Sequence, residues 1–417
     1  MSGIIGIFNQ DNNDTNIEDL IFGMYALQHR GQDTMGIVLY DDDNIEKKYG
    51  PGTVADNISL DDVDKLRANV SIGHMKYEFL GEKATENMPY FYNGGSVAID
   101  GVITNEDFSL QELVEKIQGS EEELTEYISG LKGAFAMVYA DKDKLMAIRD
   151  SHSVKPISVG VKDKEFIVAS ETCAFDSVGA EKYKDLIGGE IFIVTKNKIQ
   201  SIYSKQREHR LAIFEMLYIQ RPDSYVEGVS VYKSRFNAGE ILYDECKTDA
   251  DIVIGSPESG SIAALGYAKK ANIECLPGLV KNRYIKRTFI EKEDSTRRNS
   301  VKVKLNAVKE IIQGKDVILV DDSIVRGTTI RRVVETLKNA GAKKIHVRIA
   351  SPEIRTSDSI TIDIPDERKL IAYRRTLEEM REEIGCDSLY FLSLNGLRNA
   401  CGNKGYYERY FWGESHE

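Results

Sequence analysis

Proline and cysteine are scarce in this chain, at 8 and 5 of 417 residues. So few prolines argue against long disordered tails and Pro-rich linkers. The cysteine count is odd and no two cysteines form a C-x-x-C pair, which excludes a disulfide framework and suits a reducing cytoplasm, where we expect the protein. The cysteines are Cys173, Cys246, Cys275, Cys386 and Cys401.

Long apolar runs are also missing. No stretch of 18 apolar residues occurs, so we expect no membrane span, and the first residues, MSGIIGIF, lack the basic start of a signal peptide. The formal net charge of −12 disfavours nucleic acid as a partner. Residues 281–304 depart from this balance, because they are strongly basic and suggest a small anionic ligand.

The length suits two domains, which we place at 1–205 and 206–417. The first domain has helical periodicity near 17–29 and 110–130, and its many short alternating runs predict a sheet sandwich of the α+β class. The strands expected there are 3–8, 96–103, 134–140, 155–161, 165–170 and 190–194.

The second domain alternates strand and helix. We expect strands at 250–256, 315–322 and 343–351, with helices at 261–271 and 329–341. This order predicts an α/β domain with a doubly wound parallel sheet. We interpret 366–417 as helical trim, that is, as additional helices at the C-terminal end of this domain.

The most informative motif is VILVDDSIVRGTT at 317–329. An apolar strand ends in two aspartates, and a loop with Gly327 opens the next helix, whose N-terminal N–H groups favour a phosphate. Paired carboxylates repel phosphate and favour hydroxyls or a metal ion, so ribose 5-phosphate satisfies both halves. The plainer alternative is an acidic turn with a Ser/Thr cap.

This motif resembles the phosphoribosyl pyrophosphate (PRPP) loop of type I phosphoribosyltransferases, most closely that of the glutamine PRPP amidotransferase family. YALQHRGQDTMGI (25–37), RPDSYVEGVSVYKSR (221–235) and LVKNRYIKRTFI (279–290) match the same family. The resemblance implies an N-terminal-nucleophile glutaminase domain followed by an α/β type I phosphoribosyltransferase domain.

By this resemblance, Asp321 and Asp322 hold the ribose hydroxyls and a Mg ion. The loop GSPESG (255–260) corresponds to the pyrophosphate loop, with Glu258, Ser259 and Gly260 as substrate-binding candidates. Gly260 stands where the family often has Ser, so ligation of the metal from this position is in doubt. The residues expected to cradle the 5-phosphate are Ser323, Val325, Arg326, Gly327, Thr328 and Thr329.

The basic block 281–304 matches the family's lid. Displacing pyrophosphate builds negative charge on the leaving group, which Arg, Lys and Mg can stabilise, and a lid excludes water. Our candidates are Lys281, Arg283, Arg287 and Lys304, with Tyr284 facing the acceptor. The alternative for each cation is a solvated surface loop.

The glutaminase half departs from the family pattern. Ser2 replaces the nucleophilic Cys, Lys76 replaces an Arg that clamps the glutamine carboxylate, and IDG (99–101) replaces HNG. Asp100, beside Gly101, would place negative charge where an oxyanion develops. The family's amine-binding region is also shortened around 119–124. We therefore expect no glutamine hydrolysis.

Some family members carry an iron–sulfur cluster on four cysteines. Ala212 occupies one such position and Cys401 stands alone, so we expect no cluster.

The main functional prediction is transfer of the 5-phosphoribosyl group from PRPP to ammonia or another small amine, without glutamine hydrolysis. One alternative is a glutamine-dependent amidophosphoribosyltransferase of purine synthesis, or its Cys-to-Ser form. Another is a catalytically silent regulator that binds PRPP or nucleotides. The family commonly forms homo-oligomers, which we expect here as well.

Overall fold

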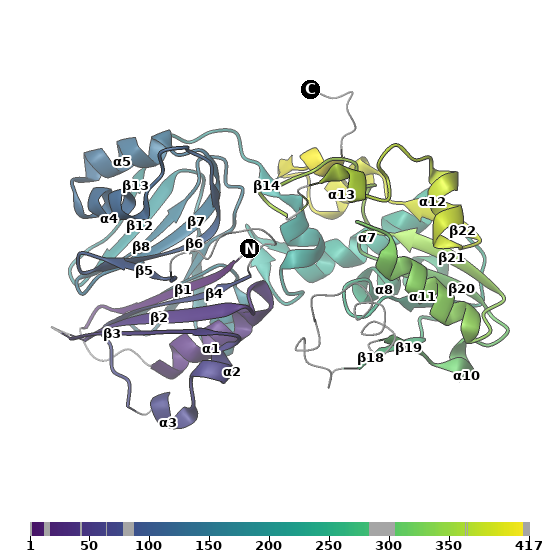
Figure 1. Ribbon diagram of the computed structural model, residues 1–417, viewed down its shortest axis with the longest axis horizontal. Coiled ribbons are helices and arrows are strands. Elements are labelled where there is room, and N and C mark those ends of the chain that lie inside the picture. The colour runs from purple at the N-terminus through teal and green to yellow at the C-terminus, as the bar shows by residue number, and fades with distance from the viewer. Residues whose placement is uncertain are drawn as a thin grey trace.

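The computed structural model describes residues 2–11, 17–41, 44–63, 65–77, 87–282, 305–362, 364 and 366–411. Figure 1 shows two halves side by side, with antiparallel sheets in the N-terminal half and a parallel sheet in the C-terminal half. The N-terminal end lies near the junction of the halves.

The N-terminal half contains two antiparallel sheets. One has the order β11-β9-β10-β1-β4-β2-β3 and the other β13-β12-β8-β7-β6-β5. Its strands are β1 (Ser2–Asn9), β2 (Thr34–Asp41), β3 (Asn44–Pro51), β4 (Val70–Lys76), β5 (Tyr90–Tyr92), β6 (Gly95–Ile103), β7 (Gly133–Ala140), β8 (Lys144–Arg149), β9 (Ser158–Lys162), β10 (Glu165–Ala169), β11 (Glu181–Asp185), β12 (Glu190–Thr195) and β13 (Ile199–Tyr203).

The two sheets pack face to face, and helices cover both outer faces. The helices are α1 (Ile17–Leu27), α2 (Val54–Asn57), α3 (Leu60–Val63), α4 (Leu110–Gln118), α5 (Glu121–Gly130) and α6 (Cys173–Val178). Ile4 and Val138 are buried between the two sheets, whereas Leu20 of α1 and Leu113 of α4 are buried in the two outer cores, between helices and sheet. The central strands, such as β1 and β7, alternate their side chains between an inner and an outer core, so the four-layer α+β sandwich follows from apolar residues on both faces of these strands.

The C-terminal half has a four-stranded parallel sheet, in the order β17-β20-β21-β22, with helices on both faces. The strands are β17 (Ile252–Gly255), β20 (Asp316–Asp321), β21 (Lys344–Ile349) and β22 (Ser388–Phe391). Its helices are α7 (Val231–Glu245), α8 (Ser261–Ala271), α10 (Lys309–Ile312), α11 (Thr328–Asn339), α12 (Leu377–Ile384) and α13 (Leu394–Ala400). The predicted doubly wound α/β domain is confirmed.

Two details of the sequence-based prediction are wrong. The segment 366–417 is not only helical trim, because β22 supplies the fourth strand of the parallel sheet. The strand expected at 155–161 begins at Ser158, since the main-chain N–H of Lys155 turns instead to the Asp150 carboxylate. The domain boundary near residue 205 stays a prediction.

Short strand pairs complete the second half: β14 (Leu211–Ala212) with β23 (Tyr406–Tyr407), β15 (Tyr225–Val226) with β16 (Val229–Ser230), and β18 (Leu279–Lys281) with β19 (Leu305–Ala307). A π-helical segment, Glu215–Ile219, follows β14 and lies beside the N-terminal half.

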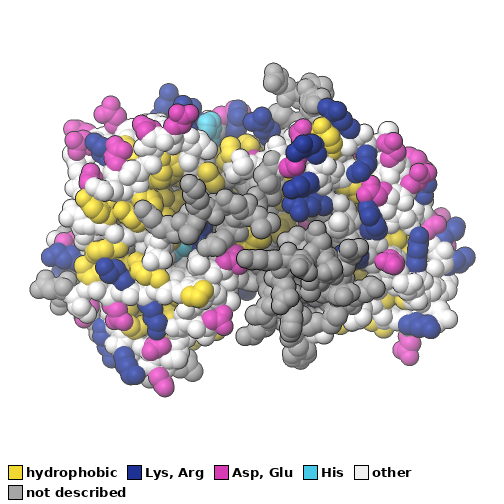
Figure 2. All heavy atoms as spheres, in the orientation of Figure 1, with side chains coloured by type: hydrophobic (Ala, Val, Ile, Leu, Met, Phe, Trp, Pro, Cys, Tyr) yellow, Lys and Arg dark blue, Asp and Glu magenta, His cyan; other side chains and the backbone are white. Residues whose placement is uncertain are grey.

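Basic and acidic side chains are interspersed on the face of the second half that carries α11 and α12 (Figure 2). Within the described residues, no helix combines the length and the apolarity needed to cross a bilayer.

Candidate functional site

Two loops meet at the carboxyl edge of the parallel sheet. β17 pairs in parallel with β20, and Gly255 lies opposite Val320 in this register. The loop after β17 therefore begins beside the loop after β20, and the main-chain N–H of Ser256 donates to the Val320 carbonyl at 2.8 Å. This edge is where ligands bind in open α/β sheets.

Asp321 and Asp322 lie at this edge and are each only 6% exposed. Burial, and then the charge of Asp322, raise the pKa of Asp321 well above its ordinary value. The hydroxyl of Ser323 donates to Asp322 Oδ2 at 2.6 Å, and Ser259 Oγ lies 3.5 Å from Asp321 Oδ1. Within the described residues, neither carboxylate forms an ion pair with Lys, Arg or His. Such a pair is electrostatically unsatisfied and favours a cation.

The chemistry of this pair fits Mg²⁺, which prefers oxygen ligands and commonly combines one or two carboxylates with substrate oxygens. The described residues contain no group of three or more His, Cys, Asp or Glu side chains able to hold a metal. Asp321 and Asp322 would therefore share the ion with substrate oxygens. A bound Mg²⁺ would supply positive charge against a pyrophosphate leaving group.

The loop from Ser323 to Gly327 leads into α11, which begins at Thr328, one residue earlier than expected. Gly327 has a φ of 73°, and a Cβ there would lie 2.4 Å from Ile371 Cδ1, so the position requires glycine. The N–H of Ile371 donates to the Val325 carbonyl at 2.9 Å and fixes the loop from outside. Exposed Thr328 and Thr329 present the first turn of α11 to an anion.

Gly260 makes close contact between the two loops. A Cβ at Gly260 would lie 2.4 Å from the Val320 carbonyl oxygen and 2.8 Å from Asp321 Cα. The glycine thus permits the backbone approach that places Ser259 beside Asp321. Ser256, which sequence reasoning missed, is 5% exposed and its side chain forms a hydrogen bond with Asp321. Its position directly after β17 was the available signal.

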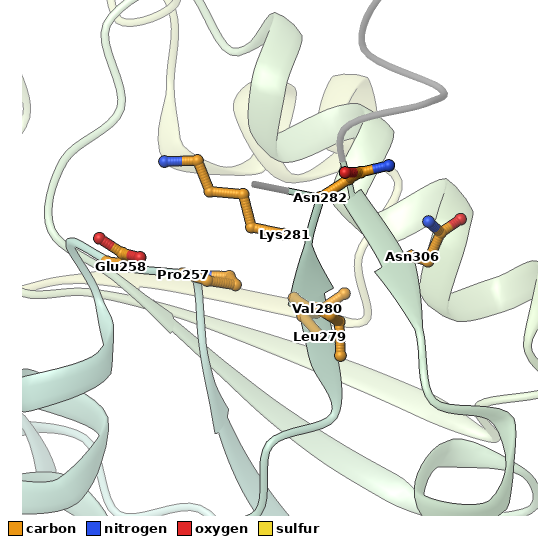
Figure 3. Close-up of a pocket in the computed structure, with 7 residues that line it drawn as sticks. All are labelled: Pro257, Glu258, Leu279, Val280, Lys281, Asn282 and Asn306. Atoms are coloured by element: carbon orange, nitrogen blue, oxygen red, sulfur yellow. The ribbon is translucent and has the colours of Figure 1, made fainter. Parts of the chain in front are cut away.

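A pocket of about 600 Å³ opens beside this edge, and Figure 3 shows Glu258 and Lys281 reaching toward one side of it. Lys281 ends β18, and its exposed side chain is free to approach a bound anion. The pocket is lined by Pro257, Glu258, Leu279, Val280, Lys281, Asn282 and Asn306. Arg283, Tyr284, Arg287 and Lys304 lie outside the described residues, so their roles stay predictions.

A second cluster of buried charges surrounds Ser2. The main-chain N–H of Ser2 donates to Asp100 Oδ1 at 2.8 Å, and Arg30 Nε donates to the Ser2 carbonyl at 2.9 Å. Arg30 Nη2 also donates to Asp100 Oδ2 at 2.7 Å. Asp100 and Arg30 are fully buried.

This cluster continues across the junction of the two halves. Arg30 binds Glu171 at 2.7 Å and Glu215 at 2.9 Å, and Lys155 binds Glu215 at 3.3 Å. Glu215 belongs to the second half, whereas Arg30 and Glu171 belong to the first. The main-chain N–H of Arg221 adds a bond of 2.9 Å to Glu171. The Ser2 region is thus joined directly to the C-terminal half.

The electrostatics here are opposite to those at Asp321. Burial alone would raise the pKa of Asp100, but Lys155, Arg30 and the Ser2 N–H outweigh burial and lower that pKa. Burial likewise opposes ionisation of Glu171, yet His29 and Arg30 lower its pKa to about 2. Asp100 is therefore a charged carboxylate whose two oxygens already have partners.

The remaining glutaminase candidates occupy the same strands. Lys76 ends β4 directly opposite Ser2, and it is partly exposed. Gly101 follows Asp100 with a φ of 121°, and a Cβ would lie 2.0 Å from the Ala134 carbonyl, so packing alone explains this glycine. The structure thus brings Ser2, Lys76, Asp100 and Gly101 together, as the sequence predicted, without testing their roles. Arg30, Glu171 and Glu215 were missed, although LQHRGQD (27–33) contains the first of them.

Fold and site together define a protein with a glutamine-amidotransferase-type N-terminal domain and a type I phosphoribosyltransferase domain. Family models agree: residues 104–177 match the glutamine amidotransferase domain and residues 231–355 the phosphoribosyl transferase domain.

Whole-chain relatives identify the family. The chain is 36% identical to amidophosphoribosyltransferase of Methanothermobacter thermautotrophicus, covering 96% of this chain and 91% of the relative. It is 36% identical to the Bacillus subtilis enzyme, covering 92% and 86%. The solved B. subtilis glutamine PRPP amidotransferase, complexed with ADP and GMP, matches with a TM-score of 0.85 and 33% identity over 98% of this chain and 94% of that chain. The chain belongs to the amidophosphoribosyltransferase family.

Proposed function

We propose that this protein transfers the 5-phosphoribosyl group of PRPP to a nitrogen nucleophile and releases pyrophosphate, as an amidophosphoribosyltransferase of purine synthesis. The observation that carries the proposal is the buried Asp321–Asp322 pair at the mouth of a glycine-containing loop that opens α11. The carboxylates suit ribose hydroxyls and Mg²⁺, while the helix N-terminus suits the 5-phosphate.

The two loops divide the work between the ends of the substrate. Residues 323–329 would bind the phosphate, and residues 256–260 would face the pyrophosphate from the adjacent strand. Lys281 would add positive charge on the leaving-group side, as the pocket in Figure 3 suggests. The nitrogen lone pair then attacks C1 of the ribose as the C1–O bond to pyrophosphate breaks.

Glutamine is the nitrogen source that the relatives favour. Two of them are named amidophosphoribosyltransferase, and the solved neighbour is named glutamine PRPP amidotransferase. The similarity covers almost the whole chain, including the N-terminal half, so it supports the glutamine-dependent alternative better than the ammonia-dependent prediction.

A second candidate is the same transfer with free ammonia or another small amine. It is favoured by one observation: Asp100 is a buried carboxylate bound to Ser2 N and Arg30. A fixed negative charge beside the nucleophile opposes the oxyanion that glutamine hydrolysis must form. Lys76 also cannot reproduce the two-pronged geometry of an arginine clamp.

Pyrophosphate release from PRPP and Mg²⁺ tests both candidates, with ammonium chloride and glutamine supplied in parallel. Release with glutamine supports the complete amidotransferase. Release with ammonium alone supports the second candidate, and the triple variant Ser2→Cys, Lys76→Arg, Asp100→Asn should then gain glutaminase activity that Ser2→Cys alone lacks.

Release with neither nitrogen source would contradict both candidates. Tight PRPP binding by calorimetry without turnover would then favour the catalytically silent regulator. Cytoplasmic location and homo-oligomeric assembly remain predictions, as does the expectation that no iron–sulfur cluster is bound.

A further inference from the structure

A histidine lies on the linker, residues 204–210, which connects β13 of the N-terminal half to β14. This residue, His209, places its Nε2 2.8 Å from Glu227 Oε2, in the turn between β15 and β16. The other oxygen of Glu227 lies 2.8 Å from the guanidinium of Arg149, which ends β8 and has a side chain 1% exposed. Glu227 therefore contacts both the linker and a buried cation of the N-terminal half.

Both ring nitrogens of His209 face acceptors. Nε2 lies 3.0 and 2.8 Å from the two carboxylate oxygens of Glu227, and Nδ1 lies 3.1 Å from the carbonyl oxygen of Gly405. Carboxylates and carbonyls only accept hydrogen bonds, whereas a neutral imidazole has one N–H and one lone pair. A neutral ring would thus turn its lone pair toward one of these acceptors, and only the imidazolium can donate to both.

The electrostatics agree with this geometry. Burial alone would raise the pKa of Glu227, but His209 and Arg149 outweigh burial and lower that pKa to about 2, so the carboxylate stays charged near neutral pH. The hydrogen bond with Glu227 is the main cause that raises the pKa of His209, against burial and the charge of Arg149.

Other charged and titratable groups surround the ring. Burial raises the pKa of Tyr406, which keeps its phenol neutral around pH 7, and Arg210 lowers the pKa of Glu208. Histidine is the side chain that changes charge near neutral pH, so His209 and His152 are the members of this group that do so. The neighbours of the ring are Arg149 of β8, Glu227, Lys404, Tyr406 of β23, Glu208, Arg210 and His152.

We propose that His209 is a pH-sensitive latch between the two halves, closed when its imidazolium bridges Glu227 and Gly405 and released when the ring is neutral. Gly405 directly precedes β23, which pairs with β14, so the closed latch holds the linker against the C-terminal segment. Glu227 extends the contact to Arg149. This regulatory contact goes beyond the proposed transfer reaction and does not depend on it.

The direction of the pH effect follows from the raised folded-state pKa of His209. The stability that the latch contributes is fully present below about pH 6.5, the unfolded value, and is lost as pH rises through the raised value. Mildly alkaline conditions should therefore loosen the junction while the rest of each half stays folded.

His209→Gln in the full chain tests the latch, because the amide cannot become a cation. The parent should unfold at a temperature higher than the variant by roughly 2 °C or more near pH 6, and by less than about 1 °C near pH 9. In a Glu227→Gln background, the effect of His209→Gln should no longer depend on pH, since the ring has lost its carboxylate partner.

His152→Gln is the matched control. His152 also contacts the linker, but through Nδ1 at 2.9 Å from the Glu208 carbonyl, a bond that a neutral tautomer satisfies. The difference between the parent and His152→Gln should therefore be the same near pH 6 and near pH 9.

Trypsin cleavage locates the change, because Lys205, Arg207 and Arg210 are exposed on the linker. The parent and His209→Gln are compared at each pH, so that the pH dependence of the protease cancels. We expect the linker of the variant to be cut about 5-fold faster than that of the parent near pH 6, and at about the same rate near pH 9.

A difference in unfolding temperature between the parent and His209→Gln that is constant with pH would overturn the proposal. A difference that grows with rising pH would overturn it as well, because the folded protein would then prefer the neutral ring. Equal linker cleavage in the two proteins near pH 6 would show that His209 does not hold the linker. If Glu227→Gln does not fold, His209→Gln and the cleavage rates decide.

Discussion

The two clusters of buried carboxylates in this protein differ in what surrounds them. At the edge of the parallel sheet, Asp321 and Asp322 face each other, and burial with like charge raises the pKa of Asp321. At the domain junction, Asp100 and its neighbours face Arg30 and Lys155, which lower the pKa of Asp100 despite its burial. Both sets of side chains are almost inaccessible to solvent, so exposure does not distinguish them.

This difference separates a carboxylate pair that has no ion-pair partner among the described residues from a cluster whose carboxylates are paired with cations of the chain. Buried charge is costly unless it is paired, and the proposed function assigns the pairing of the first cluster to a metal ion and substrate. The second cluster uses side chains from both halves, so its charges contribute to the docking of the halves. A buried carboxylate whose partners all come from the chain can therefore act as part of the scaffold.

Arg30→Met should have the largest effect on the second cluster. The variant leaves three buried carboxylates with Lys155 as their remaining fully buried cation, and the free energy of unfolding should fall by about 3–5 kcal/mol. Urea unfolding followed by circular dichroism measures it. Arg210→Met is the control, because the Arg210–Glu208 pair is more than half exposed and should contribute less than about 1 kcal/mol. Equal effects of the two substitutions would contradict a stabilising role for the cluster.

Asp321→Asn should have the largest effect on catalysis. Losing one of the two carboxylates that suit Mg²⁺ should slow pyrophosphate release by about 100-fold or more. Asp316→Asn is the matched control, since Asp316 begins the same strand at the edge of the sheet away from the site. A rate for Asp321→Asn close to that of the control would contradict the proposed PRPP site.

The sequence predicted the first cluster far better than the second. Asp321, Asp322 and Gly327 are contiguous, and an apolar strand followed by an amphipathic helix fixes where they lie. Arg30 and Glu215 meet only because two halves dock, and no local pattern encodes that contact. For the same reason β22, which lies 39 residues beyond β21, was assigned to helical trim, because its short run gives no pairing partner.

Gly260→Ser sharpens the comparison by introducing the residue that the family often has. A Cβ would lie 2.4 Å from the Val320 carbonyl, so backbone must shift and the free energy of unfolding should fall by about 1–3 kcal/mol. The KM for PRPP should rise in parallel, since the shift moves Asp321. Gly130→Ser at the end of α5 is the control, because a Cβ there meets nothing within 4 Å. An unchanged KM and an unchanged free energy of unfolding in Gly260→Ser would show that this loop accommodates a side chain at low cost, and would contradict the prediction.

The smallest expected effect concerns two isosteric substitutions, Asp321→Asn and Asp100→Asn, which should change the free energy of unfolding in opposite directions. Because the folded-state pKa of Asp321 is raised, the ligand-free protein loses stability as pH rises from about 3.9, the unfolded value, through that raised pKa. Asp321→Asn removes this loss, and should stabilise the ligand-free protein at pH 7 by on the order of 1 kcal/mol. Asp100 contributes in the opposite sense, because its lowered pKa gives stability that is present above about 3.9 and lost as pH falls below it.

Asp100→Asn should therefore destabilise the protein at pH 7, and the loss in its free energy of unfolding relative to the parent should become smaller in acid. Asp321→Asn should be more stable than the ligand-free parent at pH 7, and this gain should also become smaller in acid. Thermal unfolding of both variants and the parent between about pH 2 and about pH 8 measures these slopes, because the contribution of Asp100 changes only below about 3.9. Saturating Mg²⁺ and PRPP should abolish the advantage of Asp321→Asn, since the ligands then stabilise the native carboxylate and not the amide. Shifts of the same sign in both variants would mean that the two clusters are electrostatically alike, and that Asp321 is a satisfied structural carboxylate as much as Asp100 is.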